Sequence, residues 1–144
     1  MFIGEYQHNL DSKSRIIIPS KFRDALQTTF ILARGLDGCL SIYSNSQWEK
    51  YIEEVSKLPT TKMDVRKYLR MLTSQTQECS LDNQGRIQIP TFLAKPVKIE
   101  KECVIIGAND HIEIWDKATW DAYYLDASES FEKVAENLSD LFNE

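Results

Sequence analysis

The chain has 144 residues, 42% of them apolar, which suits one globular domain or two very small units sharing a core. No apolar run approaches the ~20 residues of a membrane helix. Residues 1–6 show neither the basic flank nor the apolar stretch of a signal peptide, so we expect a cytoplasmic protein.

The net charge of −5 argues against a nucleic-acid partner until its distribution is considered. Residues 126–144 carry six acids and one base, so residues 1–125 hold 16 acids and 16 bases and sum to zero. Residues 11–34 hold five bases against two acids, a local charge of +3. A local basic face of this kind is enough for contacts with phosphates. The five bases are Lys13, Arg15, Lys21, Arg23 and Arg34.

Cysteine usage agrees with a reducing compartment. The three cysteines are odd in number and form no CxxC pair. We therefore expect Cys39, Cys79 and Cys103 to be reduced, buried thiols.

Two hairpins and a helix are expected in the first third of the chain. Residues 6–10 alternate weakly, a polar turn follows, and the Ile-rich strand 15–18 ends at Pro19. Residues 30–33 and 39–43 flank an Asp-Gly turn and predict the second hairpin. A helix is expected from Ser44, because Ser44 and Gln47 have the spacing of a capping box.

Residues 60–75 predict a basic amphipathic helix. We interpret its bases as a solvated face rather than a DNA contact. They are Lys62, Arg66, Lys67 and Arg70.

The second half of the chain repeats the first. Residues 81–90 match residues 10–19 at an offset of 71, in both cases with the pattern Leu-Asp-x-x-x-Arg-Ile-x-Ile-Pro. Residues 112–115 match residues 40–43 at an offset of 72, which also pairs Trp48 with Trp120. The same elements are therefore expected twice, with a second helix capped by Asp116.

The tail predicts an acidic helix, with apolar side chains at helical spacing between residues 130 and 142. Four aromatic residues near the two capped helices are expected in the core, although they would also suit a protein interface. They are Trp48, Trp120, Tyr123 and Tyr124.

The Asp-x-x-x-Arg motif places an acid and an arginine on the two sides of each turn, where the carboxylate can accept from backbone N–H groups and hold the guanidinium. The Asp–Arg pair either stabilises the turn or orients the arginine toward DNA. For Asp82 and Arg86 we favour the structural role, because Gln84 leaves that turn poor in charge. For the first turn we favour DNA contact, with Lys13 on phosphate and Arg15 on phosphate or a guanine edge, since a two-stranded ribbon fits the major groove.

An enzyme is the weaker alternative. The only histidines, His8 and His111, are not spaced with a cysteine nucleophile or a carboxylate pair. The sequence has no Gly-rich phosphate loop and no metal-ligand cluster. We expect no catalytic activity, cofactor or metal.

These motifs resemble the MraZ family of bacterial proteins over essentially the whole chain. The resemblance is carried by Phe2-x-Gly4-x-Tyr6-x-His8-x-Leu10-Asp11, by Asp11-x-Lys13-x-Arg15-Ile16-x-Ile18-Pro19, by Phe22-Arg23, by Arg34-Gly35-Leu36-Asp37-Gly38-Cys39-Leu40 and by Asp82-x-x-x-Arg86-Ile87-x-Ile89-Pro90. Ser14 stands where the family usually has Gly before the first arginine.

The resemblance implies an α+β, mainly β fold: a pseudo-twofold duplicated, swapped-hairpin AbrB-like β-barrel with flanking helices. It implies a SpoVT-AbrB-like unit at 5–47 and a second at 77–120. Connecting helices would occupy 48–76 and an acidic amphipathic helix 121–144.

The resemblance also implies a nucleoid-associated transcriptional regulator, without a membrane or small-molecule partner. It would bind short direct repeats of double-stranded DNA at the promoter of the division and cell wall gene cluster, as a ring-shaped homo-oligomer. Its DNA contacts would be Asp11, Lys13 and Arg15, to which charge adds Lys21 and Arg23. The alternative is an antitoxin-like protein-interaction module.

Overall fold

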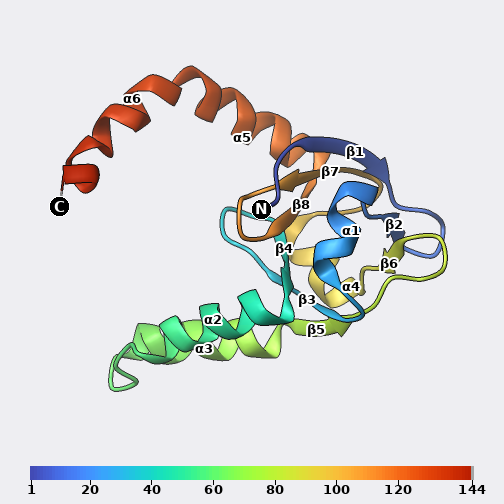
Figure 1. Ribbon diagram of the computed structural model, residues 1–144, viewed down its shortest axis with the longest axis horizontal. Helices are drawn as coiled ribbons and strands as arrows, with labels where there is room; N and C mark the ends of the chain where they lie inside the picture. Colours follow the sequence, from blue (N-terminus) through green and yellow to red (C-terminus); the bar gives the residue numbers. More distant parts are fainter. Residues whose placement is uncertain (144) are drawn as a thin grey trace.

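The computed structural model describes residues 1–143, which form a strand-built body with two helical arms on one side (Figure 1). The body contains one six-stranded antiparallel sheet and one two-stranded sheet. The six-stranded sheet has the order β1 (Glu5–Asn9), β7 (Glu102–Gly107), β8 (Ile112–Asp116), β4 (Leu40–Ser44), β3 (Phe30–Arg34) and β5 (Thr76–Cys79). The two-stranded sheet pairs β2 (Arg15–Ile17) with β6 (Arg86–Gln88).

The expected barrel is wrong. Strands β1 and β5 are the two edges of the six-stranded sheet and do not pair with each other within the described chain. The remaining strands of each copy, β2 and β6, leave this sheet and form a separate ribbon. The fold is therefore mixed α+β with an open antiparallel sheet, and the AbrB-like assignment remains a prediction.

The two inner hairpins are confirmed, and the two outer ones are not. Strand β3 pairs with β4, and β7 pairs with β8, as adjacent patterns along the chain predicted. Strand β1 instead pairs with β7, β2 with β6, and β5 with β3. The reason is burial: Ile16 of β2 and Ile87 of β6 face the same side of the short ribbon, and pairing these two strands covers that side with a core from both copies.

The pairing follows the sequence repeat. Ile16 lies opposite Ile87, its own counterpart at the offset of 71, and Ser41 lies opposite Glu113 at the offset of 72. A pseudo-twofold axis between the copies therefore passes through both of these residue pairs. Each copy therefore completes the sheet of the other.

One hydrophobic core joins the copies. Ile16 and Ile18 are fully buried, and Ile87 and Ile89 are almost so. They pack in a single cluster with the sheet residues Phe30 and Ile105, among others. All three cysteines are free and buried, as expected.

Short helices follow the ribbon strands. Helix α1 (Ser20–Leu26) follows β2, while α4 (Thr91–Ala94) and the 3₁₀ turn η1 (Lys95–Val97) follow β6. Pro19 and Pro90 occupy the N-cap positions of α1 and α4, where a missing N–H leaves no helical hydrogen bond unmade.

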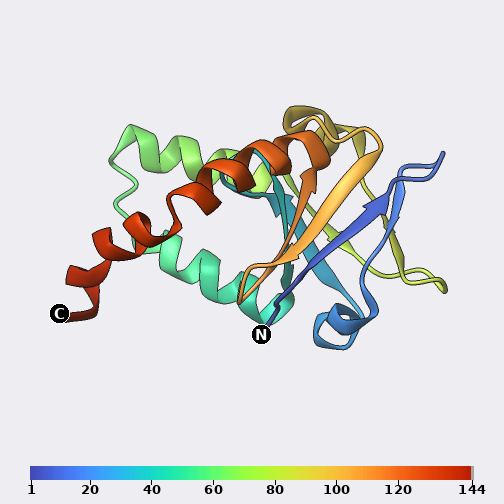
Figure 2. The same cartoon turned by 90° about the horizontal axis from the view of Figure 1, so that it is seen from above.

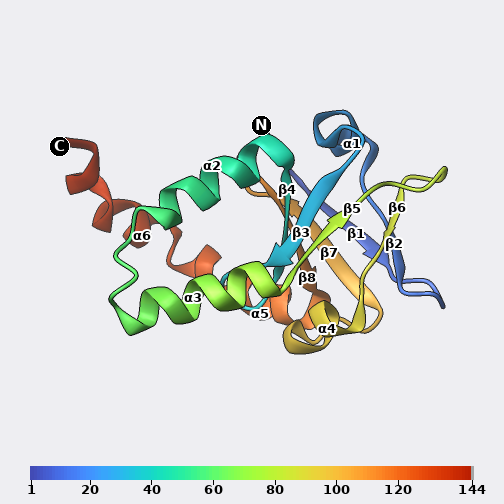
Figure 3. The ribbon, with the colours of Figure 1, turned by 90° about the horizontal axis from the view of Figure 1, so that it is seen from below.

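The longer helices form the arms. Helices α2 (Asn45–Ser56) and α3 (Met63–Ser74) run side by side as one arm (Figure 3). The second arm is α5 (Lys117–Glu129), α6 (Phe131–Asn137) and the 3₁₀ turn η2 (Ser139–Asn143). Both expected caps are present: the Ser44 hydroxyl accepts from the Gln47 N–H, and the Asp116 carboxylate accepts from the Thr119 N–H. Within residues 1–143, no helix has the length and apolar content to cross a bilayer.

The expected burial of the aromatic residues is wrong for two of four. Tyr123 and Tyr124 are 43% and 55% exposed, because they lie on α5 where it leaves the sheet. Trp48 and Trp120 are partly buried. The buried tryptophan of this region is Trp115, on β8.

The ribbon supplies the first testable prediction. Ile16→Ala removes a fully buried side chain at the pairing centre and should lower the free energy of unfolding by about 2–5 kcal/mol. Ile17→Ala, one residue on and 40% exposed, is the matched control and should cost about 0.5–1 kcal/mol. Urea unfolding followed by circular dichroism measures both, and equal losses would contradict the assigned register.

Candidate nucleic-acid interface

The first Asp-x-x-x-Arg motif forms a tight loop held by one carboxylate. Asp11 Oδ1 accepts from the backbone N–H groups of Lys13 and Arg15, both at 2.9 Å. Asp11 Oδ2 accepts from Arg15 Nε at 2.7 Å. Backbone hydrogen bonds from Asp11 N to Arg15 O and from Ser14 N to Asp11 O close the loop. We call residues 11–14 the first tip.

The second motif has the same geometry. Asp82 Oδ1 accepts from the N–H groups of Gln84 and Arg86, both at 2.9 Å, and Oδ2 accepts from Arg86 Nε at 2.8 Å. We call residues 82–85 the second tip. Both tips lie at the end of the body opposite the helical arms (Figure 2).

Strand exchange links each tip to the other copy. The Ile18 N–H donates to Gly85 O, and the Ile89 N–H donates to Ser14 O, both at 2.9 Å. The Gln88 side chain donates to Lys13 O at 2.9 Å, and Arg86 Nη1 lies 3.7 Å from Asp11 Oδ2. Arg86 therefore contacts carboxylates of both tips, which supports a structural role for this residue.

Hydrogen bonding lowers the pKa of both tip carboxyls. For Asp11 the largest cause is the Arg15 N–H, partly opposed by desolvation and aided by the Lys13 N–H and the Arg15 guanidinium. For Asp82 the causes are the same, from Arg86 first and then Gln84. Both carboxyls are therefore ionised at neutral pH and can orient their arginines.

The tips differ at the residue before the arginine. Gly85 has φ of 74° and is buried, because the Arg23 guanidinium lies against it; a Cβ built there would sit 2.3 Å from Arg23 Cζ. Ser14 has φ of 59° and is exposed, so the first tip keeps the glycine-like conformation with a serine. The counterpart of Arg23 at the offset of 71 is Ala94, whose short side chain lines a cavity with Ser14.

The sequence-predicted residues are therefore divided between the tips. The structure brings Asp11 and Lys13 of the first tip together with Arg15, the residue that follows the tip. It places Arg23 at the second tip, where Nε donates to Ile18 O at 2.8 Å. Lys21 is exposed on α1, the helix that carries Arg23.

Sequence reasoning missed three lysines near the first tip. Lys95 and Lys98 line the same cavity as Ser14, and the Lys101 carbonyl accepts from the Leu10 N–H at 2.8 Å. Applying the expected swapped-hairpin arrangement to the chain after Pro90 would have brought these residues to the first tip.

The family comparison covers both units. A model of the MraZ protein family, described as antitoxin-like, matches residues 1–71 and again residues 72–142. The chain belongs to the MraZ family. The MraZ family is a regulator or antitoxin-like family and not a family of enzymes, and its unit matches this chain twice, in agreement with the sequence repeat.

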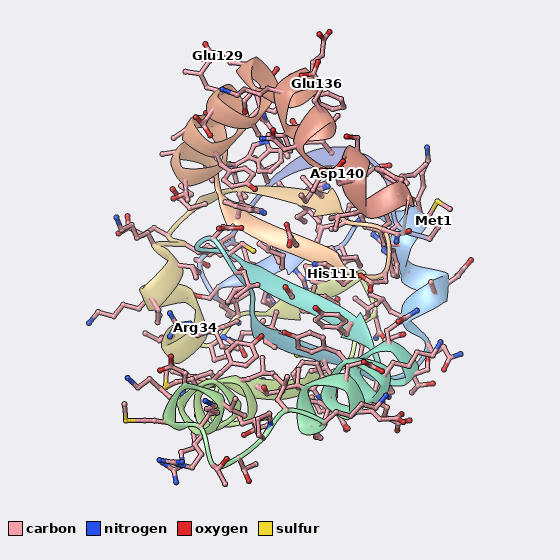
Figure 4. All side chains as sticks on the ribbon, turned by 90° about the vertical axis from the view of Figure 1, so that its left-hand side faces the viewer. Met1, Arg34, His111, Glu129, Glu136 and Asp140 are labelled. Atoms are coloured by element: carbon pink, nitrogen blue, oxygen red, sulfur yellow. The ribbon has the colours of Figure 1, made fainter. Side chains whose placement is uncertain are left out.

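A second concave region lies on the arm side of this MraZ-family chain. A cavity of about 420 Å³ is lined by aromatic side chains of both arms, including Tyr51, Tyr68 and Trp120. Figure 4 looks onto this side: Arg34 and His111 lie over the sheet, and Glu129, Glu136 and Asp140 lie on the second arm.

His111 is held in this region by one aromatic ring and two carboxylates. Its ring stacks on Tyr43 with centroids 4.9 Å apart. Its nitrogens contact Asp110 at 2.7 Å and Glu113 at 3.0 Å. Burial opposes protonation, but these carboxylates outweigh it and raise the pKa of His111.

The contrast between Ser14 and Gly85 gives the second prediction. Gly85→Ala should lower the free energy of unfolding by about 1–2 kcal/mol, because it strains a positive φ and displaces the Arg23 guanidinium. Ser14→Gly should leave it unchanged or raise it by up to about 1 kcal/mol, since it relieves strain without any displaced neighbour. Urea unfolding measures the free energy of unfolding of both variants. An equal loss of stability in Ser14→Gly and Gly85→Ala would contradict the difference described between the two tips.

The tip carboxyls give the third prediction. Because their folded-state pKa is lowered below the ordinary 3.8, their contribution to stability is present above that value and is lost as pH falls through the folded pKa. Unfolding free energies between about pH 5 and pH 2 should therefore fall more steeply for the natural protein than for the double variant Asp11→Asn, Asp82→Asn. Parallel curves would show that the two carboxyls are not the acid-sensitive groups.

Proposed function

We propose that this protein is a sequence-specific DNA-binding transcriptional regulator that contacts double-stranded DNA through its first tip. It acts in the cytoplasm at the nucleoid, on direct repeats at the promoter of the division and cell wall gene cluster. Family membership supports a regulator-like role, and the tip geometry supports the DNA contact.

The observation that carries the proposal is the fixed presentation of Arg15 beside a free lysine. Asp11 holds Arg15 through Nε, and no ion pair of the outer guanidinium nitrogens is present among the described residues, so these nitrogens can donate to a base edge or phosphate. Lys13 is exposed, and its ammonium makes no ion pair among residues 1–142. The second tip has Gln84 at that position, and its arginine also reaches Asp11. The first tip is therefore the better DNA contact.

A homo-oligomer is part of the proposal, because one tip presents few cations. Several tips on a ring would bind spaced DNA repeats together and raise the affinity without new contacts in any one subunit. The second arm supports self-association: within residues 1–142, α5 and α6 have no buried side chain. Its exposed apolar side chains include Leu125, Phe131, Val134, Leu138 and Leu141. An uncovered surface of this kind is typical of an interface.

The alternative function is an antitoxin-like protein-interaction module. The same exposed arm and the antitoxin-like description of the family favour it. It predicts a protein partner for the arm and no affinity for promoter DNA, so DNA binding decides between the two.

The fourth prediction tests the division of roles between the tips. Arg15→Ala should weaken binding to the promoter repeats by about 1–3 kcal/mol, or roughly five- to 150-fold, for each contacting subunit, while the oligomer persists. Arg86→Ala should mainly lower stability or assembly, because Arg86 joins Asp82 and Asp11. Gel shifts measure the binding and light scattering the assembly.

Lys13→Gln is a second test of the first tip, because it replaces Lys13 with the residue that the second tip has at the same position, Gln84. Among the described residues, the Lys13 hydrogen bonds involve its backbone and not its ammonium, so stability should be unchanged while DNA affinity falls. If the natural protein bound no promoter fragment at low salt, the proposed function would be wrong. If Arg15→Ala and Arg86→Ala behaved alike, the asymmetry of the tips would be wrong.

A further inference from the structure

Three lysines of the second copy flank the first tip. Lys95, Lys98 and Lys101 are all exposed, and none has an ion pair within the part of the chain that the structure describes. They follow α4, which lies 70 or more residues after the first tip in sequence.

The exchange of strands between the copies explains why these lysines lie near the first tip. The Ile89 N–H donates to Ser14 O, so the chain leaving β6 runs past the first tip before entering α4. A cavity of about 270 Å³ beside the tip is lined by Ser14, Lys95 and Lys98, together with Thr91 and Glu100. Lys101 is exposed, and its backbone lies next to the start of the first motif, since its carbonyl accepts from the Leu10 N–H directly before Asp11.

Within the described residues, the helix beside the second tip carries Lys21 and Arg23 but has no lysine at the positions that match Lys95 and Lys98. At the offset of 71, Asp24 is the counterpart of Lys95 and Gln27 the counterpart of Lys98. Both residues have positive φ, 60° at Gln27 and 62° at Lys98, but ψ is −150° at Gln27 and 24° at Lys98, so only Lys98 has left-handed helical backbone. An acid and an amide therefore stand at the second tip where lysines stand at the first.

Two acids lie among the lysines and reduce the positive charge of the cluster. Glu100 and Glu102 are both exposed, and residues 95–102 sum to +1. Lysines on flexible side chains can each reach a separate phosphate of a DNA backbone. Lys13 extends the row, which makes four lysines around the first tip.

We propose that Lys95, Lys98 and Lys101 extend the DNA-binding surface from the first tip along the phosphate backbone. This inference rests on the proposed DNA-binding function and adds to it a sequence-independent contact supplied by the second copy. The first tip then reads bases, while the lysines of the other copy set the affinity and its dependence on salt.

The test is the triple variant Lys95→Gln, Lys98→Gln, Lys101→Gln, titrated with promoter DNA and with unrelated duplex over a range of salt concentrations. Each lost phosphate contact reduces the slope of log K against log salt by about 0.9, so the slope should become shallower by up to about 2.7 for each bound subunit. Affinity for both duplexes should fall by a similar factor, which leaves the ratio between them unchanged.

The matched control is the triple variant Lys50→Gln, Lys62→Gln, Lys67→Gln, which removes the same charge from exposed positions on the first arm. Its salt slope should equal that of the natural protein. Equal changes in the two variants, or no change in the Lys95 variant, would overturn the inference. If the natural protein binds promoter DNA and Arg15→Ala does not, the proposed function stands whatever the lysine variant does. If the natural protein does not bind promoter DNA, the proposed function itself is wrong.

Discussion

The antiparallel pairing of β2 with β6 is the interaction on which the rest of the structure depends. Each strand is three residues long, too short to be stable alone, and gains its stability from the isoleucines that it buries in the common core. Because Ile16 faces its own counterpart Ile87, this pairing also fixes the relation between the copies. The two tips and the helices that contact them take their positions from it.

Exchange of strands explains why two similar motifs acquire different surroundings. Each Asp-x-x-x-Arg loop makes the same hydrogen bonds with its own carboxylate. Each is then packed against the helix of the opposite copy, and those helices differ in sequence. Arg23 covers Gly85, whereas Ala94 leaves Ser14 open. The two copies share one backbone framework, but the helices beside the tips differ in sequence. This difference makes the first tip more exposed and more basic than the second.

Local chemistry could be predicted from the sequence, and long-range pairing could not. The caps at Ser44 and Asp116 depend on neighbouring residues only and are present as expected. The outer hairpins were wrong because alternation shows which face of a strand is buried and not which strand lies beside it. For the same reason, the bonds between Asp11 and Arg15 were foreseen, while the place of Lys95 beside Ser14 was not. Tyr124 was misplaced because the pattern of α5 does not show where the helix leaves the sheet.

Interleaving also governs the order in which the chain can fold. Ile16 must wait for a partner 71 positions further along, so closure of a long loop precedes the contacts that stabilise either half. During synthesis, β2 and the edge of β3 that later receives β5 stay unpaired until the second copy has left the ribosome. A chain interrupted between the copies would expose these strand edges, which are templates for aggregation. The duplication thus makes the pair of copies, rather than one copy, the smallest cooperative folding unit.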